Sequence, residues 1–442
     1  MRFLTNFGNL LWTWILPVML VGTAILCGVS SKFTPISHPQ RILHNTYGTL
    51  FRRPCDKKQL RTTATALAAT MGTGNLVGTA AAICTGGAGA VFWMLCSAVL
   101  GILLVYAENA IGMRFRRRLP DGTWCGGAIA CLRYGLKKPA LSYVFAVCCA
   151  TAGLGMGSMA QASAIASTAE NFGIPRNLVG LTVCLTAAWI LYGGKNRIGS
   201  VTVWLMPLIC GLYLLGCGVL ICKNAAYLSD AIARIFREAF GFRGMVGGFC
   251  GTAFLRSMSV GLRRGIFSNE AGLGTSAMLH MEADASVSSI QGDWAAVEVF
   301  ADTVICCTAT ALVILTTPQL SCSIETDASA LLLNSFSYGF GSSAAGFLAV
   351  SMILLAFATL IGWYPCGLAA VRSLGICGAE DVYFVLWILA AFCGTLNPAA
   401  FAFALCDCCN ALMAIPNLYA LTALRKNLKM EEVHENSKCG GT

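Results

Sequence analysis

Long stretches of this chain carry no charged residue, and this feature constrains its fold more than any other. No Asp, Glu, Lys or Arg lies between Arg61 and Glu108, or between Asp327 and Arg372. A spanning helix needs about 20 apolar residues to cross about 30 Å of hydrocarbon, so each run is long enough for a helical hairpin. Only 11% of the 442 residues are charged, against about 25% in an ordinary soluble domain. The chain is therefore predicted to be an all-α integral membrane protein.

We expect about eleven transmembrane helices, a leader helix near 10–29 and ten core helices. The leader is long for a signal peptide, and no clear cleavage site follows it before Lys32, so we interpret it as a membrane helix. The core helices are expected at 63–84, 88–111, 140–167, 178–193, 199–222, 244–264, 294–317, 344–371, 382–396 and 400–423. They divide into two fives, which is typical of inverted repeats in carriers, where each first helix is often broken.

The same division predicts five segments. They are a leader helix with a basic cytoplasmic stretch (1–62), a first five-helix repeat (63–222), an amphipathic interfacial helix (223–243), a second five-helix repeat (244–424) and a cytoplasmic tail (425–442).

Positive charge is concentrated in short blocks between the apolar segments. The net charge is +10, and the segments 30–62 and 112–139 each hold seven Lys and Arg residues. Such blocks are typical of cytoplasmic loops, and they place the N-terminus outside and the C-terminus in the cytoplasm. We therefore interpret the charge as a topology signal and not as a nucleic-acid site. The expected location is the plasma membrane, in a bacterium the inner membrane.

Cysteine is abundant, with 23 residues that lie mostly within apolar runs. A disulfide framework belongs to small secreted domains, and no pair of CxxC motifs has zinc-ligand spacing. We interpret these cysteines as small apolar packing residues, with a structural metal site as the alternative. No cofactor and no metal beyond a coupling ion is expected.

The first core helix contains a cluster of glycines near its middle, in the segment 68–78. Glycine weakens a helix, and broken backbone at membrane depth is tolerated where it lines a cavity. A break here would expose the N–H groups of Thr73 and Gly74, which attract a carboxylate, and the carbonyls of Ala68 and Met71, which attract a cation. Close helix packing through small residues explains the glycines equally well.

The sixth core helix is too long for one crossing, because residues 244–283 would span about 60 Å as a helix. Arg263 and Arg264 are interpreted as its cytoplasmic boundary, which places Ser257 and Met258 near the midplane as the second break. A continuous helix with serines bonded to its own backbone is the alternative. Arg256 would face the protein interior or water, and its role is open.

Polar residues elsewhere in the chain complete the candidate set. Asn269 and Glu270 would follow the cytoplasmic end of the sixth helix and act as a gate by pairing with basic loops, or else form a solvated loop. Gln161 is costly to bury without a partner, and Thr359 and Trp363 share one helix face. Ordinary ion pairs near helix ends are expected for Glu108, Asp302 and Asp407.

Four segments resemble the signature of the alanine or glycine:cation symporter family. They are 64–94, with Ala-Thr-Met-Gly-Thr-Gly-Asn and Phe-Trp-Met, then Arg-Gly-Ile-Phe-Ser-Asn-Glu-Ala-Gly-Leu-Gly at 264–274, Val-Phe-Ala-Asp-Thr-Val-Ile-Cys at 299–306 and Leu-Met-Ala-Ile-Pro-Asn-Leu at 412–418. The similarity extends over about residues 60–425 in the same order. It implies the fold of the amino acid–polyamine–organocation superfamily and symport of alanine, glycine or D-alanine with Na⁺ or, less often, H⁺.

Carried over by motif, the resemblance implies a substrate site and a sodium site. The chain departs from the family pattern at Leu95, at 126–129 and at 364–367, where an acid of the family is absent. The expected substrate-binding residues are Thr73, Gly74, Asn75, Gln161, Ser257, Met258, Thr359 and Trp363, and the expected sodium ligands are Ala68, Met71 and Thr359.

These observations together predict a secondary active transporter that takes a small neutral amino acid into the cell with Na⁺ by alternating access. An H⁺-coupled permease is the alternative, followed by a passive channel and a membrane-embedded enzyme. The chain contains no HExxH or GxSxG motif and no facing pair of intramembrane carboxylates, so no enzyme activity is expected. The expected partners are the amino acid, Na⁺ and the lipid bilayer, and the oligomeric state is open.

Overall fold

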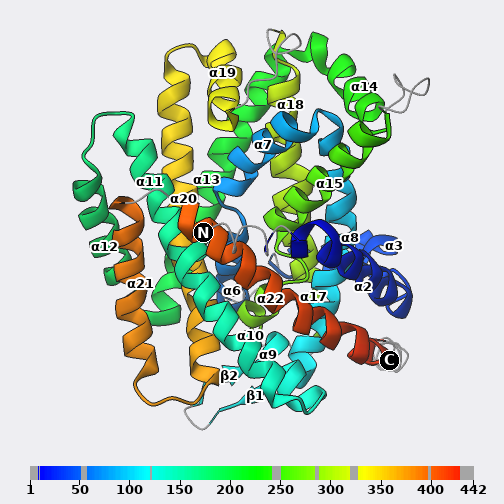
Figure 1. Cartoon of the computed structure of the whole chain (residues 1–442), viewed down its shortest axis with the longest axis vertical. Coiled ribbons are helices and arrows are strands. Elements are labelled where there is room, and N and C mark those ends of the chain that lie inside the picture. The colour runs from blue at the N-terminus through cyan, green and yellow to red at the C-terminus, as the bar shows by residue number, and fades with distance from the viewer. Residues whose placement is uncertain are drawn as a thin grey trace.

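A computed structural model describes residues 8, 10–50, 57–119, 122–240, 250–283, 288–318, 327–396 and 400–428 (Figure 1). Nearly all of these residues lie in helices. Among them the one sheet is a short antiparallel pair, β1 (Arg117–Arg118) and β2 (Trp124–Cys125). The prediction of an all-α membrane protein is confirmed.

Six helical segments are long and apolar enough to span a membrane. They are α8 (Gly89–Phe115), α10 to α11 (Pro139–Glu170), α13 (Gly194–Lys223), α17 to α18 (Ser288–Leu315), α20 (Ser343–Ser373) and α21 (Ala379–Leu396). A bent pair, α6 (Lys57–Thr70) and η2–α7 (Thr73–Gly86), makes a seventh candidate, and α2 (Leu16–Ser30) and α12 (Arg176–Tyr192) are shorter apolar helices. The structure thus supports six or seven spans in the described part of the chain, and the count of eleven is not confirmed.

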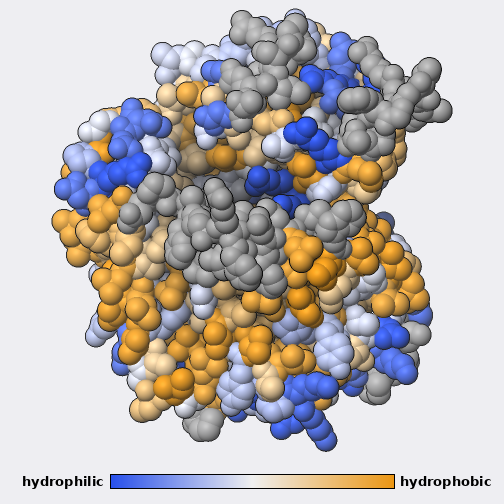
Figure 2. Space-filling view, viewed as in Figure 1, coloured by the Kyte–Doolittle hydropathy of each residue, from blue (hydrophilic) through white to orange (hydrophobic). Residues whose placement is uncertain are grey.

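The outer surface of the helices suits a bilayer. Large apolar side chains point outward along α12 and α13, among them Trp189 (65% exposed), Trp204 (83%) and Leu215 (72%). Figure 2 shows a broad apolar band, with hydrophilic residues gathered mainly toward the two ends. Exposing such a large apolar surface to water is unfavourable, whereas contact with lipid hydrocarbon carries no such cost.

The helices form two groups with α6 between them (Figure 1). In the first group α8 packs along α2, α15 (Cys250–Asn269), α16 (Thr275–His280) and α17 (Ser288–Val299). In the second group α20 and α21 pack against α10 (Pro139–Ala152), α11 (Gln161–Glu170) and α12. Helix α6 contacts α20 of the second group and α16 and α17 of the first, so it lies where the two groups meet.

The remaining elements cover the ends and one side of these groups. Helix α22 packs on α10 and α2, and α14 packs on α8. Their bounds, with those of the shorter elements, are η1 Leu11–Ile15, α3 Thr34–Ser37, α4 Pro39–Asn45, α5 Tyr47–Leu50, α9 Gly127–Ala130, η3 Cys131–Gly135, η5 Ala225–Tyr227, α14 Leu228–Ala239, α18 Thr308–Leu315, α19 Ala328–Phe340 and α22 Ala400–Leu424.

The first core helix is broken, as predicted. Helix α6 ends at Thr70, η2 (Thr73–Asn75) begins three residues later, and the axes of the two halves differ by 53°. Gly72 adopts an extended conformation between them. The Asn75 side chain accepts a hydrogen bond from the Gly72 N–H at 3.2 Å, which replaces a lost helical bond.

The second break is real, but its predicted position at Ser257 and Met258 is wrong. Helix α15 runs without interruption from Cys250 to Asn269, and a serine or methionine does not force a helix to stop. The break lies at 270–274, where Glu270, Gly272 and Gly274 have φ values of 51°, 89° and 82°. Glycine adopts this left-handed conformation without a steric cost, so the two glycines set the position.

The break lies further along the chain than predicted, so Arg263 and Arg264 do not have their predicted role as the boundary of the sixth core helix. Both lie inside α15, ahead of the break, and do not mark the end of the helix. Asp407 makes an ion pair with Arg263 at 3.6 Å, as expected for that carboxylate.

Two π-helical segments interrupt spans beside the breaks. They are η4 (Gly153–Ala160), between α10 and α11, and η6 (Phe300–Cys307), between α17 and α18. A π-helical turn re-aims the side chains that follow it, and such turns are frequent at functional sites. The two breaks and the two π-helical segments therefore point to one functional region.

Candidate functional site

A cavity of about 240 Å³ lies where the two broken helices meet. We name it the central cavity. It is smaller than the roughly 300–1,000 Å³ typical of sites for drug-sized ligands, and this size suits a small molecule. Its lining residues come from the first core helix, from η4 and α11, from the sixth core helix and from α20, and they are Ala69, Thr70, Gly72, Thr73, Gly74, Val77, Gly78, Ala81, Met156, Gln161, Arg264, Phe267, Ser268, Glu270 and Thr359.

The backbone at Thr73 and Gly74 borders this cavity at the start of the second half of the first core helix. The first N–H groups of a helix have no preceding acceptor, and they carry partial positive charge. A Cβ atom placed on Gly74 would meet nothing within 4 Å, so a ligand has room to approach this backbone closely. The structure thus places both predicted residues at a position suited to a carboxylate.

Thr359 lies directly opposite the break. Its hydroxyl donates to the Leu355 carbonyl at 3.1 Å, and its Oγ1 lies 3.5 Å from the Met71 carbonyl oxygen. Two of the three predicted sodium ligands are therefore neighbours. The third, Ala68, is fully buried against α20. The two helices are close at this point, since a Cβ atom built on Gly362 of α20 would lie 2.9 Å from the Ala68 carbonyl carbon.

Gln161 supplies an acceptor without a partner. Its Nε2 donates to the Met156 carbonyl at 3.2 Å, whereas its Oε1 is buried and has no hydrogen-bond partner among the described residues. Leaving such an atom unsatisfied costs about 1–3 kcal/mol. A ligand ammonium or N–H group in the central cavity would remove that cost.

Asn75 was predicted to bind substrate, but it does not line the central cavity. Its side chain is buried between the break and η6, where Nδ2 donates to the carboxylate and the backbone carbonyl of Asp302. Asn75 therefore fixes the shape of the break.

Three further predicted site residues also lie away from the cavity lining. Ser257 and Met258 are more than two helical turns from the break, because α15 continues past them. Trp363 is fully buried, and its Nε1 donates to Glu270 Oε1 at 2.9 Å. Trp363 thus adjoins the site through Glu270.

The predicted pairing of Asn269 and Glu270 with basic loops is wrong. Both side chains are buried, with 2% and 3% exposure, because the break folds them into the protein. Asn269 Oδ1 accepts from the Ala271 N–H at 3.1 Å. Glu270 lines the central cavity and accepts from Trp363 and from Thr275 Oγ1, the latter at 2.9 Å.

Asp302 and Glu108 differ from the ordinary ion pairs predicted near helix ends. Asp302 is fully buried in η6 and accepts from Ser268 Oγ at 2.9 Å and Thr303 Oγ1 at 2.8 Å, besides Asn75. Glu108 is buried as well and accepts from Asn417 Nδ2 at 2.7 Å. Within the described residues these carboxylates are held by neutral donors.

Sequence reasoning also missed several residues of the lining. Met156, Arg264, Phe267 and Ser268 border the cavity, and Arg264 brings a positive charge to it. A signal existed for three of them, because they belong to the motif at 264–274. Nothing in the sequence marks Met156, which η4 turns toward the site.

A family model described as the sodium:alanine symporter family matches residues 1–438. The chain belongs to this family. It is 32% identical over 436 residues to an uncharacterized transporter of Haemophilus influenzae, with 96% of this chain and 93% of the relative covered. It is 30% identical to the sodium/alanine symporter AgcS of Methanococcus maripaludis (94% and 93% covered) and 31% identical to the "Probable sodium/glutamine symporter GlnT" of Bacillus subtilis (95% and 87%). The protein is therefore a multi-pass membrane transporter and not an enzyme.

Proposed function

We propose that this transporter takes up a small neutral amino acid, alanine, glycine or D-alanine, together with Na⁺ by alternating access. One observation carries the proposal. The open backbone at Thr73 and Gly74 and the oxygens of Met71 and Thr359 lie next to each other at the same break. A carboxylate and a cation would thus bind side by side in a cavity of amino-acid size.

The substrate would be held at both of its charged ends. Its carboxylate would accept hydrogen bonds from the N–H groups of Thr73 and Gly74. Its ammonium group would donate to Gln161 Oε1, the acceptor without a protein partner. Ala69, Met156 and Phe267 leave an apolar wall for a short side chain, which favours alanine over a long or charged one.

Coupling would follow from the closeness of the two ligands. Na⁺ would bind the carbonyls of Ala68 and Met71 and the Thr359 hydroxyl. Opposite charges a few Å apart attract strongly where water is excluded. Each ligand would then raise the affinity of the other by the same factor.

The H⁺-coupled alternative rests on Glu270, a buried carboxylate that lines the central cavity. Protonation of Glu270 would remove one negative charge from the site and so change its net charge by the same amount as binding of Na⁺. The predicted orientation, with the N-terminus outside and the C-terminus in the cytoplasm of a bacterium, remains part of this proposal.

Uptake by purified protein in sealed liposomes tests the proposal. Radiolabelled alanine would be followed with an inward Na⁺ gradient, with an inward H⁺ gradient and with neither. We expect accumulation above equilibrium with Na⁺ alone. Accumulation with H⁺ alone would replace the sodium site by the Glu270 alternative, and equilibration without accumulation would indicate a passive pathway. Competition by unlabelled glycine, D-alanine and glutamine would define the substrate range.

A further inference from the structure

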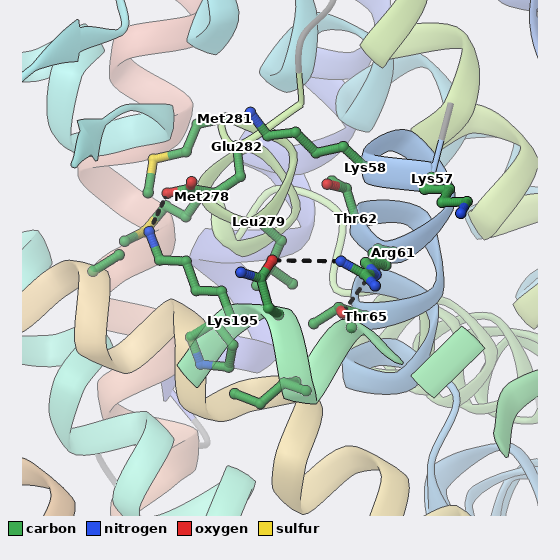
Figure 3. A pocket seen from close by; sticks show the side chains of 15 residues that line it. Lys57, Lys58, Arg61, Thr62, Thr65, Lys195, Met278, Leu279, Met281 and Glu282 are labelled. Carbon is green, nitrogen blue, oxygen red and sulfur yellow. Dashed lines mark hydrogen bonds and ion pairs between the residues drawn. The ribbon is translucent and has the colours of Figure 1, made fainter. Parts of the chain in front are cut away.

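A second and larger cavity, of about 420 Å³, lies at the other end of α6 (Figure 3). We name it the basic cavity, because four of its lining residues are Lys or Arg and one is acidic. Lys195 and Glu282 form an ion pair of 2.5 Å across it. Its lining residues are Lys57, Lys58, Arg61, Thr62, Thr65, Lys195, Asn196, Ile198, Gly199, Met278, Leu279, Met281, Glu282, Pro365 and Ala369.

The two cavities lie along one face of α6. Arg61 and Thr65 line the basic cavity, and Ala69 lines the central cavity. These residues are four apart, so they form one stripe along the helix, and the step from Thr65 to Ala69 covers only about 6 Å. On α20, Thr359 lines the central cavity and Pro365, six residues later, lines the basic cavity. Only a thin layer of protein separates the cavities.

This layer contains the contact between Glu270 and Trp363. The two carboxylate oxygens of Glu270 accept from Trp363 Nε1 on α20 and from Thr275 Oγ1 at the start of α16. Beside them α20 packs closely against α6, since a Cβ atom built on Gly362 of α20 would lie only 2.7 Å from the backbone nitrogen of Ala69 on α6. The hydrogen bond from Trp363 joins the second helix group to the break of the sixth core helix.

The inner half of the sixth helix is bound to its own group by a separate buried network. His280 contacts Gln291 Oε1 at 2.8 Å and Glu298 Oε1 at 3.0 Å, and Gln291 donates to Gln59 Oε1 at 2.6 Å. These contacts join α16 to α17 and α6. Helix α16 is thus expected to move together with α6, and away from α20, when the layer opens.

We propose that Glu270 and Trp363 form the inner gate of the transport path and that the basic cavity is the vestibule through which substrate leaves. This inference rests on the proposed function and deepens it. The ammonium group of a substrate in the central cavity competes with Trp363 Nε1–H for Glu270 Oε1. Binding therefore weakens the contact that holds the layer closed, and separation of α16 from α20 joins the two cavities.

Thiol labelling from the basic side tests the gate without any need for transport. Thr65→Cys reports on the basic cavity, and Ala69→Cys, one turn further along the same stripe, reports on the central cavity. Inside-out membrane vesicles would be treated with an impermeant methanethiosulfonate reagent, and modification at residues 65 and 69 would be quantified by mass spectrometry. Site-specific detection keeps the native cysteines from obscuring the result.

We expect Thr65→Cys to react in every background and Ala69→Cys to react slowly. Adding Trp363→Phe should raise the rate at residue 69 about tenfold or more, because leaving a buried acceptor without its hydrogen-bond partner shifts an equilibrium by that order. Alanine with Na⁺ should raise the rate with Trp363 present and add little without it. Trp387→Phe is the matched control, because Trp387 is equally buried but its Nε1 has no hydrogen-bond partner among the described residues.

Several outcomes would overturn the inference. An unchanged rate at residue 69 in Trp363→Phe, with normal labelling at residue 65, would show that Trp363 does not close the path. An equal increase in Trp387→Phe would assign the effect to general loosening. Absence of labelling at residue 65 in protein that elutes as a single species would exclude the vestibule. If alanine uptake proves independent of Na⁺ while the labelling pattern holds, the gate stands and the proposed coupling ion fails.

Discussion

Replacing Gly72 with alanine tests whether Met71 and Thr359 hold the coupling cation. Gly72 has φ −124° and ψ −160°, an extended conformation that any residue adopts. A methyl group on Gly72 would lie 2.8 Å from Thr359 Oγ1 and 3.7 Å from Thr359 Cβ. The substitution therefore strains one contact and leaves the backbone relaxed.

The size of the effect follows from that contact. A distance of 2.8 Å is shorter than Cβ atoms tolerate, so the Thr359 hydroxyl must turn away or α20 must shift. Overpacking of this kind costs about 1–3 kcal/mol. If the free energy of Na⁺ binding becomes less favourable by this whole amount, Na⁺ affinity falls by about 5- to 150-fold. We expect the half-saturating Na⁺ concentration to rise by a factor in this range.

The assay is the initial rate of radiolabelled alanine uptake into liposomes at a series of Na⁺ concentrations. Gly74→Ala is the matched control, because its methyl group meets no protein atom within 4 Å and projects into open space. It should change the half-saturating alanine concentration more than that of Na⁺. Thr359→Ala removes the conflicting hydroxyl, so adding Gly72→Ala to it should have little further effect.

Two results would refute the reasoning. One is a Gly72→Ala protein with the Na⁺ dependence of the parent. The other is an equal loss of Na⁺ affinity when Gly72→Ala is added to Thr359→Ala, since no hydroxyl is then present to be displaced.

Three further substitutions follow from the same contacts. Gln161→Leu should raise the half-saturating alanine concentration roughly tenfold or more in uptake kinetics, because it removes the acceptor proposed for the ammonium group; an unchanged value would exclude that role. Asp302→Asn should lower the apparent melting temperature in detergent by about 1–3 °C, because the amide cannot accept from all the donors that surround Asp302, and a melting temperature equal to the parent's would contradict this. Lys195→Ala should leave the melting temperature within about 2 °C, because Lys195 is 40% exposed and such surface pairs contribute about 0–1 kcal/mol; a larger drop would show that the pair is structural.

The sequence allowed the membrane class and the first break to be predicted, for separate reasons. Uncharged runs of bilayer length report directly on burial in hydrocarbon. The glycines around Thr73 lie in mid-span, where a helix has no other use for so many of them except close packing. The structure favours the break, because Gly72 is extended and Gly74 faces open space.

The second break could not be placed by arithmetic on helix length. That estimate took Arg263 and Arg264 as a membrane boundary, so it moved the midplane to Ser257. The positive charge of Arg264 in fact borders the central cavity, which a hydropathy pattern cannot distinguish from a boundary. The better signal was Gly272 and Gly274, two residues apart after Glu270, because left-handed backbone favours glycine.

The four motifs that carry the family resemblance meet around the breaks, and this convergence accounts for residues that touch no ligand. Asn75, from the first motif, binds Asp302 of the third, and Asp302 binds Ser268 of the second. Asn417 of the fourth donates to the Gly272 carbonyl at 2.9 Å and so braces the second break. A break exposes backbone groups that must find partners in a medium without water. Two breaks in one membrane protein therefore require such a network, and its amides, hydroxyls and carboxylates fix the positions at which Thr73, Gly74 and Glu270 face the central cavity.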